Sequence, residues 1–358
     1  MPTPASVRAL VRATPTAVKL PNRALISVSG SQAAEFLNGL LSTAGLNPLF
    51  IKGRVIYDVF VHAMRDAKSQ PSYLIEYDAT TPTDTPALLP TLKRHVLRSR
   101  VRLRDASDEF DVWAAWCHDA NANNSKLWTR TKSGAIEPVW DSWPWGMEGE
   151  ALLDRRADGM GLRRLVKKGG RPQEISTHDE GVPDDYLLHR IVHGVPEGVV
   201  DIPPMQAFPM ESNLDAMGAL DFRKGCYVGQ ELTVRTYHTG VIRKRILPVL
   251  LNPSSAAPHY LNNGQPWPQF TAGLNIHASV AHAPGEGRIA RPRGTGRLLS
   301  TVRGVGLALL RLEHVEGLEK GNLKFELLDG EAGASDNDTR WLVAPWWPGW
   351  WPKEVESV

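Results

Sequence analysis

Residues 222–231 read Phe-Arg-Lys-Gly-Cys-Tyr-Val-Gly-Gln-Glu, and the most unusual residues of the chain are concentrated in and just after this stretch. Gly225 and Gly229 bracket Cys226 and Tyr227. Because glycine adopts backbone angles that other residues avoid, the chain can turn tightly here or approach a ligand closely.

A helix is predicted from Gln230 to about Tyr237, with Gly240 as its stop. Cys226 then lies just before the helix N-terminus and beside Arg223 and Lys224. Both features favour the thiolate, which is the form of cysteine that binds metal or attacks an electrophile. The alternative is that Cys226 is a small buried hydrophobic residue and that the basic residues form a solvated face.

The longer segment from Phe222 to Arg245 is basic. It holds six Arg or Lys residues and one Glu, a net charge of +5, whereas the whole chain carries +2. His238 could ligate a metal or contact an anionic substrate, or it could be a turn residue. Glu231 could orient a ligand, or it could favour the helix N-terminus through the helix dipole.

Upstream of this segment, hydrophobic periodicity predicts an α+β module. A helix over Gln32–Leu41 places Ala33, Phe36, Leu37, Leu40 and Leu41 on one apolar face. A second helix is predicted over Leu88–Val96. The predicted strands are Ala24–Val28, Val55–Ala63, Ser72–Tyr77 and Arg98–Leu103.

The remaining chain predicts two further parts. The apolar segment Val112–Cys117 reads as a core strand, which makes Cys117 a core residue, and Asp184–His193 reads as a helix ended by Gly194. A small β-barrel or sandwich is expected after Val241. Its predicted strands are Ile246–Leu251, Gly296–Ser300, Val305–Arg311, Lys324–Leu328 and Trp341–Ala344.

Composition excludes several classes of protein. With only Cys117 and Cys226, the chain is not a disulfide-stapled scaffold and cannot by itself supply a four-cysteine metal site. No apolar run reaches the ~18 residues of a membrane-spanning helix, and the near-neutral charge indicates no nucleic-acid partner. No acidic residue precedes Glu35, so residues 1–19 are expected to be a targeting-segment (transit-peptide) remnant or a disordered terminus. The tryptophan-rich Trp346–Pro352 is expected to fold back over the barrel, or else to be an exposed anchor.

The motif resembles a known family. Lys-Gly-Cys-Tyr-x-Gly-Gln-Glu at 224–231 is similar to the signature of the YgfZ-type proteins, which belong to the superfamily of the aminomethyltransferase (T-protein) of the glycine cleavage system. Further residues of the signature follow the motif: Arg235, Gly240, Arg243, Lys244 and Arg245. Weaker matches occur in the right order along most of the chain: Lys52–Asp58, Asp154–Arg156, Gly161–Arg163, Gly194–Gly198 and Gly306–Arg311.

The resemblance implies an α+β fold with a tetrahydrofolate-binding-like core and a C-terminal β-barrel. The core would comprise residues 20–240 as two α/β subdomains, about 20–105 and 106–240. The barrel would comprise 241–358, with a long insertion at about 252–295 that shows no sustained periodicity.

The resemblance also implies a function. The mitochondrial branch of the family consists of matrix proteins that act with A-type scaffold proteins in iron–sulfur cluster assembly. Their recipients are [4Fe-4S] proteins of the aconitase and lipoate synthase type. On this basis the chain is expected to be an assembly factor rather than an enzyme. Cys226 is its candidate ligand for a [2Fe-2S] cluster shared with a partner.

The alternative is a tetrahydrofolate-dependent one-carbon transferase. Aminomethyltransferases carry two adjacent acids in the strand that here reads Tyr57-Asp58, so one carboxylate is missing, which disfavours aminomethyl transfer. Asp58 could still bind a pteridine N–H, or it could be a strand-end hydrogen-bond acceptor. Candidate contacts to folate or to a partner are Arg54, Asp58, Arg235, His238, Arg243, Lys244 and Arg245. The last three could instead form a solvated barrel edge.

Overall fold

The structure is a computed structural model. It describes residues 1–42, 46–51, 53–65, 71–80, 85–117, 127–139, 151–253, 267–281, 294–328 and 340–352. Two compact units make up the chain. One contains residues 12–186 and 197–242, and the other contains residues 1–11, 187–196 and 243–351. None of the helices in the described part of the chain is both long and apolar enough to span a membrane.

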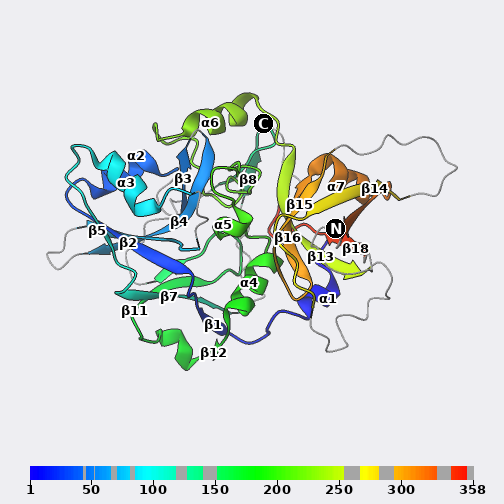
Figure 1. Ribbon diagram of the computed structural model, residues 1–358, viewed down its shortest axis with the longest axis horizontal. Helices are drawn as coiled ribbons and strands as arrows, with labels where there is room; N and C mark the ends of the chain where they lie inside the picture. Colours follow the sequence, from blue (N-terminus) through cyan, green and yellow to red (C-terminus); the bar gives the residue numbers. More distant parts are fainter. Residues whose placement is uncertain are drawn as a thin grey trace. The chain divides into compact units, whose positions relative to one another are not determined.

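The first unit contains a five-stranded sheet of strand order β3-β4-β5-β2-β6, in which all neighbours are antiparallel. Its strands are β2 (Arg23–Ser29), β3 (Leu46–Ile51), β4 (Arg54–Arg65), β5 (Pro71–Asp78) and β6 (Arg102–Asp105). The helices α2 (Ala33–Leu40) and α3 (Leu88–Val96) lie next to each other over this sheet (Figure 1) and share one apolar core with it. The five apolar residues predicted for the first helix are all buried, as the periodicity required. The fourth predicted strand, Arg98–Leu103, begins later than predicted, because the observed strand β6 starts at Arg102 and ends at Asp105.

The same unit contains a second sheet of order β10-β11-β7-β1-β12. Its strands are β1 (Thr16–Lys19), β7 (Phe110–Trp116), β10 (Ala151–Leu153), β11 (Leu162–Lys167) and β12 (Asp179–Glu180). Residues 1–19 were predicted to be a targeting-segment remnant or a disordered terminus, and the prediction of disorder is wrong for residues 16–19. Their strand pairs with β7 and has three fully buried positions, because its side chains fill the space beside an apolar partner strand.

Shorter elements complete this unit. They are β8 (Leu127–Arg130), β9 (Ile136–Val139), the 3-10 helix η1 (Gln173–Ser176), α5 (Gly198–Asp201) and α6 (Gln230–Thr239). The helix α4 (Pro183–Val192) begins in this unit and ends in the other one, and Gly194 with φ 65° follows it. Both predicted helices of this region, Asp184–His193 and Gln230–Tyr237, are confirmed to within two residues at their ends.

The second unit is a closed barrel of strand order β13-β16-β15-β14-β17-β18. Its strands are β13 (Lys244–Pro253), β14 (Asn275–Val280), β15 (Gly296–Val302), β16 (Val305–Arg311), β17 (Leu323–Leu328) and β18 (Arg340–Pro345), with α7 (Leu312–Glu319) between β16 and β17. All five predicted barrel strands are confirmed. The prediction of an insertion over 252–295 is wrong in part, because β14 lies within it and pairs with β15 and β17 to close the barrel. Residues 254–266 and 282–293 of that segment lie outside the described residues.

Residues 1–11 and the segment up to Trp351 both belong to the barrel unit. Val7 of α1 (Ala5–Arg8) is fully buried in a cluster with Ile246 of β13 and Trp346. The Trp346 N–H donates to the carbonyl of Pro248 (3.0 Å), and the indole N–H of Trp350 donates to the carbonyl of His193 (2.7 Å). The tryptophan-rich segment therefore folds back over the barrel, as expected, because its indoles find apolar surface there.

Candidate functional site

The loop that carries Cys226 is attached to the C-terminal end of α2. The Lys224 ammonium donates to the carbonyls of Asn38 (2.7 Å) and Leu41 (2.6 Å), and the Val228 N–H donates to the carbonyl of Gly39 (3.1 Å). The last carbonyls of a helix have no partners within the helix and carry partial negative charge, so a cation is stabilised there. The chain is thus held on both sides of Cys226.

Between these anchors the motif residues divide into buried and exposed ones. The ring of Tyr227 is buried, 5.3 Å from the Lys224 ammonium, and its backbone N–H donates to Oε1 of Gln230 (3.1 Å). Gly229 has φ 83° and immediately precedes α6, in a conformation that glycine adopts without strain. Glu231 is exposed in the first turn of α6, where its charge complements the helix dipole. The loop is therefore shaped largely by its own signature residues.

Burial also changes the ionisation of Lys224 and Tyr227. Burial lowers the pKa of Lys224, although the charge of Asp221 opposes this effect. Burial raises the pKa of the Tyr227 hydroxyl, and the negative charges of Asp221 and Glu231 raise it further. Both side chains therefore serve the loop as packed supports: the ammonium binds the carbonyls at the end of α2, and the tyrosine stays neutral.

Cys226 itself is exposed, with open space around Gly225 beside it. The alternative of a buried hydrophobic cysteine is therefore wrong. Within the described part of the chain, no group of three or more His, Cys, Asp or Glu residues could hold a metal ion. Among the described residues, Cys226 therefore offers a metal a single accessible thiol.

Cys117 is also exposed, which overturns its assignment to the core. Strand β7 ends at Trp116, one residue earlier, so Cys117 lies just beyond the continuous run of buried residues in that strand. Its Sγ lies 3.4 Å from Nε2 of His178. The chain therefore has two exposed thiols, and only one of them lies in the motif.

The remaining basic candidates differ in accessibility. Arg235 and His238 are exposed on α6, and the His238 ring lies 5.0 Å from the Tyr237 ring. In the barrel unit Arg243 is exposed and Lys244 is half-buried. Arg245 is 1% exposed, and its guanidinium lies 5.5 Å from the Trp351 ring, so it is a core residue of the barrel unit and not a surface contact. An inward-facing position of β13 buries it.

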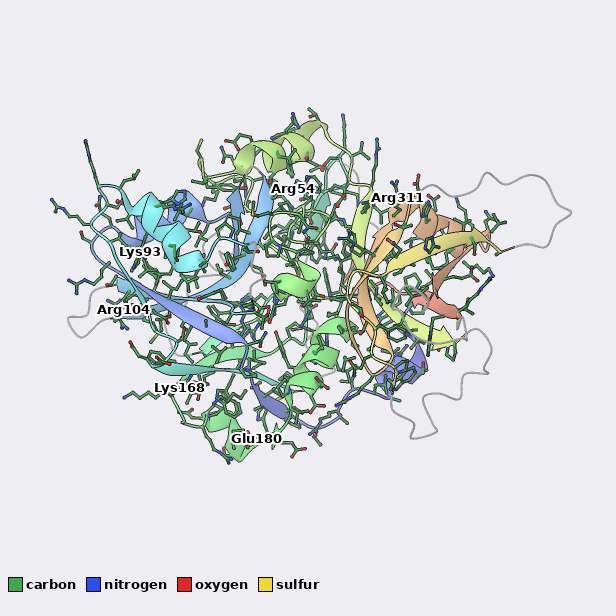
Figure 2. The ribbon with its side chains drawn as sticks, in the orientation of Figure 1. Arg54, Lys93, Arg104, Lys168, Glu180 and Arg311 are labelled. Carbon is green, nitrogen blue, oxygen red and sulfur yellow. The ribbon has the colours of Figure 1, made fainter. Side chains whose placement is uncertain are left out.

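The two folate candidates on β4 do not converge on one site. The buried Asp58 carboxylate accepts the Gly198 N–H at 3.0 Å, and burial raises its pKa while the charge of Arg23 opposes this. Arg54, which Figure 2 shows near α6, donates to the Gln206 carbonyl and lies 3.5 Å from the centroid of the Phe208 ring. Asp58 acts here as a hydrogen-bond acceptor within the fold, although it lies inside β4 and not at the end of the strand.

A buried cluster of charges, which the sequence did not predict as a site, links the two sheets. We call it the Arg163 network. Arg163 of β11 binds Glu197 and lies 3.7 Å from Glu76 of β5, and Glu76 in turn binds Arg23 of β2 at 2.8 Å. Its further members are Arg156, Asp154, His62 and Tyr186. Segments 154–156 and 161–163 resemble the family in sequence. The hydrophobic pattern of these segments does not show, however, that Arg156 and Arg163 are buried.

Mutual attraction holds the Arg163 network ionised. Burial alone would raise the pKa of Glu76, but Arg163 and Arg23 lower it to about 2. Burial would lower the pKa of the Arg163 guanidinium, but the carboxylates of Glu197 and Glu76 raise it. Glu76 and Arg163 thus exist as charges inside the unit, a state that is stable only while each keeps its partners.

Comparisons with known proteins give a consistent result. Residues 243–353 match the family described as the CAF17 C-terminal beta-barrel domain. The chain is 39% identical to the "Iron-sulfur cluster assembly factor IBA57 homolog, mitochondrial" of Cryptococcus neoformans var. neoformans serotype D (strain JEC21 / ATCC MYA-565), over 85% of each chain. Identity to the protein of the same description from Mycosarcoma maydis is 32%, over 94% of this chain and 85% of the relative.

A solved structure shows the same fold. The aminomethyltransferase T of the glycine cleavage system from Bartonella henselae superposes with a TM-score of 0.56 at 15% identity, over 95% of this chain and 87% of that one. This agrees with the α+β core and C-terminal barrel expected from the sequence. At this identity the likeness concerns the fold and not the reaction.

Proposed function

The chain belongs to the IBA57 family of mitochondrial iron–sulfur cluster assembly factors, and on that premise we propose that Cys226 is its cluster ligand. Its role is iron–sulfur cluster assembly in mitochondria. The observation that carries the proposal is the loop geometry: Lys224 and Val228 fix the backbone on both sides of Cys226, while its thiol remains exposed.

The ligand count defines what a partner must supply. Clusters of the [2Fe-2S] type are commonly held by four thiolates, and Cys226 contributes one. The cargo is therefore a [2Fe-2S] cluster shared with an A-type scaffold protein in the mitochondrial matrix. The recipients are apoproteins of [4Fe-4S] enzymes of the aconitase and lipoate synthase type.

Charged surface near the motif supports a protein partner. Arg223 precedes Cys226, and Arg235 and His238 are exposed on the helix that follows it. Exposed charges of this kind steer association and set orientation more than they add affinity. The partner surface is accordingly acidic, and complex formation weakens as the salt concentration rises.

Anaerobic reconstitution with an A-type scaffold protein tests the ligand assignment. The wild-type mixture is expected to develop the visible absorbance and circular dichroism of a shared cluster, and Cys226→Ser is expected to abolish both. Cys117→Ser is the matched control, because it removes the other exposed thiol and should leave the spectrum unchanged. An undiminished spectrum for Cys226→Ser would refute the ligand assignment.

The alternative, a tetrahydrofolate-dependent transferase, has less support from the geometry. The Asp58 carboxylate is buried against the Gly198 amide, and only one acid is present in the strand. Isothermal titration with tetrahydrofolate discriminates the two functions. Absence of binding at high micromolar concentration is expected, whereas saturable binding that Asp58→Asn removes would favour the transferase.

A further inference from the structure

The last turn of α3, the turn that follows it and the edge strand β6 concentrate positive charge. Residues 93–104 carry a net charge of +6 with no acidic residue, whereas the whole chain carries +2. The six cations are all exposed: Lys93, Arg94, Arg98, Arg100, Arg102 and Arg104. We call these six residues, together with Leu97, the α3–β6 patch. Figure 2 labels Lys93 and Arg104 at the same side of the unit.

The core of the unit fixes the direction of these side chains. Val96, Val101 and Leu103 pack against the apolar core that the sheet shares with α2 and α3. Successive side chains of a strand point to opposite sides, so Arg102 and Arg104, which flank Leu103, point away from that core. Among the described strands, β6 pairs only with β2 and forms the edge of its sheet. The patch is therefore a solvent-facing edge of the unit.

Most of these charges have no counterion within the fold. Arg104 binds Glu109, but the side chains of the other five cations form no ion pair or hydrogen bond in the part of the chain that the structure describes. The dipole of α3 accounts for Lys93 and Arg94, because the C-terminal end of a helix is partially negative. It does not account for the arginines beyond the end of the helix, whose charges remain available to an anionic surface.

Leu97 lies between these cations in the sequence. It is 87% exposed, more than any other large apolar side chain among the described residues. Its φ of 45° lies in the region that favours glycine, so the backbone of the turn gives no reason for a leucine. Protection of the sheet edge gives none either. Charged residues on an edge strand prevent association with other strands, whereas an exposed leucine promotes association.

We propose that the α3–β6 patch binds the surface of an anionic phospholipid bilayer. The cations attract the negative headgroups, and Leu97 enters the boundary between the headgroups and the acyl chains. A bilayer suits both features because it presents negative charge directly over an apolar layer. A nucleic acid would bind the cations but leave Leu97 in water. The proposal depends neither on Cys226 nor on its role in cluster assembly.

Sedimentation of the full chain with lipid vesicles tests the proposal. The vesicles contain phosphatidylcholine alone or phosphatidylcholine mixed with phosphatidylserine. Binding is expected only with phosphatidylserine, and it should weaken as the salt concentration rises, because salt screens exposed charges. Arg98→Gln combined with Arg100→Gln should lower the partition coefficient about 25-fold, at about fivefold for each cation near the surface. Both side chains are exposed, so the fold is retained.

Leu97→Ser tests the apolar contact separately. It should lower the partition coefficient about tenfold, because a leucine no longer leaves water on binding. Val182→Ser, at another apolar position that is 53% exposed, is the matched control and should bind like the wild type. Arg130→Gln combined with Lys132→Gln removes the same charge from exposed positions on β8 and just after it, and should also bind like the wild type.

Several results would overturn the proposal. They are equal binding to both kinds of vesicle, wild-type binding by either α3–β6 variant, and an equal loss of binding in the Arg130 and Lys132 control, which would show that binding follows net charge alone. Absence of binding to phosphatidylserine vesicles at low salt would overturn it as well. Binding of duplex DNA or of polyglutamate in that case would assign the patch to a nucleic acid or to an acidic protein.

Discussion

The Cys226 loop and the Arg163 network belong to the same unit but use charge in opposite ways. In the loop, the cation of Lys224 binds backbone carbonyls near the surface and leaves a thiol exposed. In the network, Arg163, Glu197 and Glu76 are buried, and their charges face one another. The difference indicates two roles: the interior charges link the two sheets, and Lys224 fixes the backbone of a loop whose thiol stays exposed, with a smaller contribution to stability.

The largest expected loss of stability comes from a change in the Arg163 network. Glu197→Ala removes the carboxylate that binds both Arg163 and Arg156 and leaves two buried guanidinium groups without it. Unfolding free energy is expected to fall by about 3–5 kcal/mol, measured by urea denaturation. The exposed Glu231→Gln serves as the control, with a change within about 0.5 kcal/mol. Equal effects of the two variants would show that the network does not hold the sheets together.

The pH dependence of stability should follow Glu76. Its pKa is about 2 in the folded protein and 4.5 in its ordinary state, so the folded state favours the ionised form. Its contribution to stability is therefore complete above pH 4.5 and is lost as the pH falls towards 2. One pKa unit corresponds to about 1.4 kcal/mol, so the loss is on the order of 3 kcal/mol.

Urea denaturation at several pH values measures this loss. Glu76→Gln should flatten the curve between pH 4.5 and 2. Asp58 should show the opposite pH dependence. Burial raises its pKa above 3.8, so its contribution to stability is lost as the pH rises. Asp58→Asn should therefore gain stability relative to the wild type above pH 3.8. An unchanged slope in Glu76→Gln would contradict the assignment.

A smaller loss of stability is expected from a change in the Cys226 loop. Lys224→Met removes the two hydrogen bonds from the ammonium to the end of α2, and a loss of about 1–2 kcal/mol is expected. Amide hydrogen exchange in the loop around Cys226 should become faster at the same time. Arg223→Met is the neighbouring control, because that side chain is largely exposed and should change stability by less than about 0.5 kcal/mol. If exchange in the loop stays slow in Lys224→Met, the backbone alone fixes Cys226.

Local patterns predicted much of the fold correctly. The helix α2 and its five buried apolar residues, the helix α3 and all five predicted barrel strands follow from hydrophobic periodicity. The motif also predicted α6, its stop at Gly240 and the position of Cys226 before it. In each case the prediction depends only on neighbouring residues, because hydrophobic periodicity and a helix-ending glycine affect the segment in which they occur.

The positions that failed depend on partners distant in the sequence. Cys117 was assigned to the core because its strand is apolar, but the strand ends one residue earlier. The short β1 lies in the segment predicted to be a targeting-segment remnant or a disordered terminus, and its strand forms by pairing with β7, nearly a hundred residues later. Likewise β14 lacks a strong pattern of its own and is defined by its neighbours in the barrel.

The amino-acid sequence by itself determined the family, the Lys-Gly-Cys-Tyr-x-Gly-Gln-Glu loop and the kinds of element along the chain, because these properties depend on residues close together in sequence. Only the tertiary structure decided which charges are buried. Arg163 and Arg245 face inward while Arg235 remains exposed, although all three are arginines in basic surroundings. The cost of burying a charge depends on its partners in space, and for Arg163 these are Glu197 and Glu76, from distant parts of the chain.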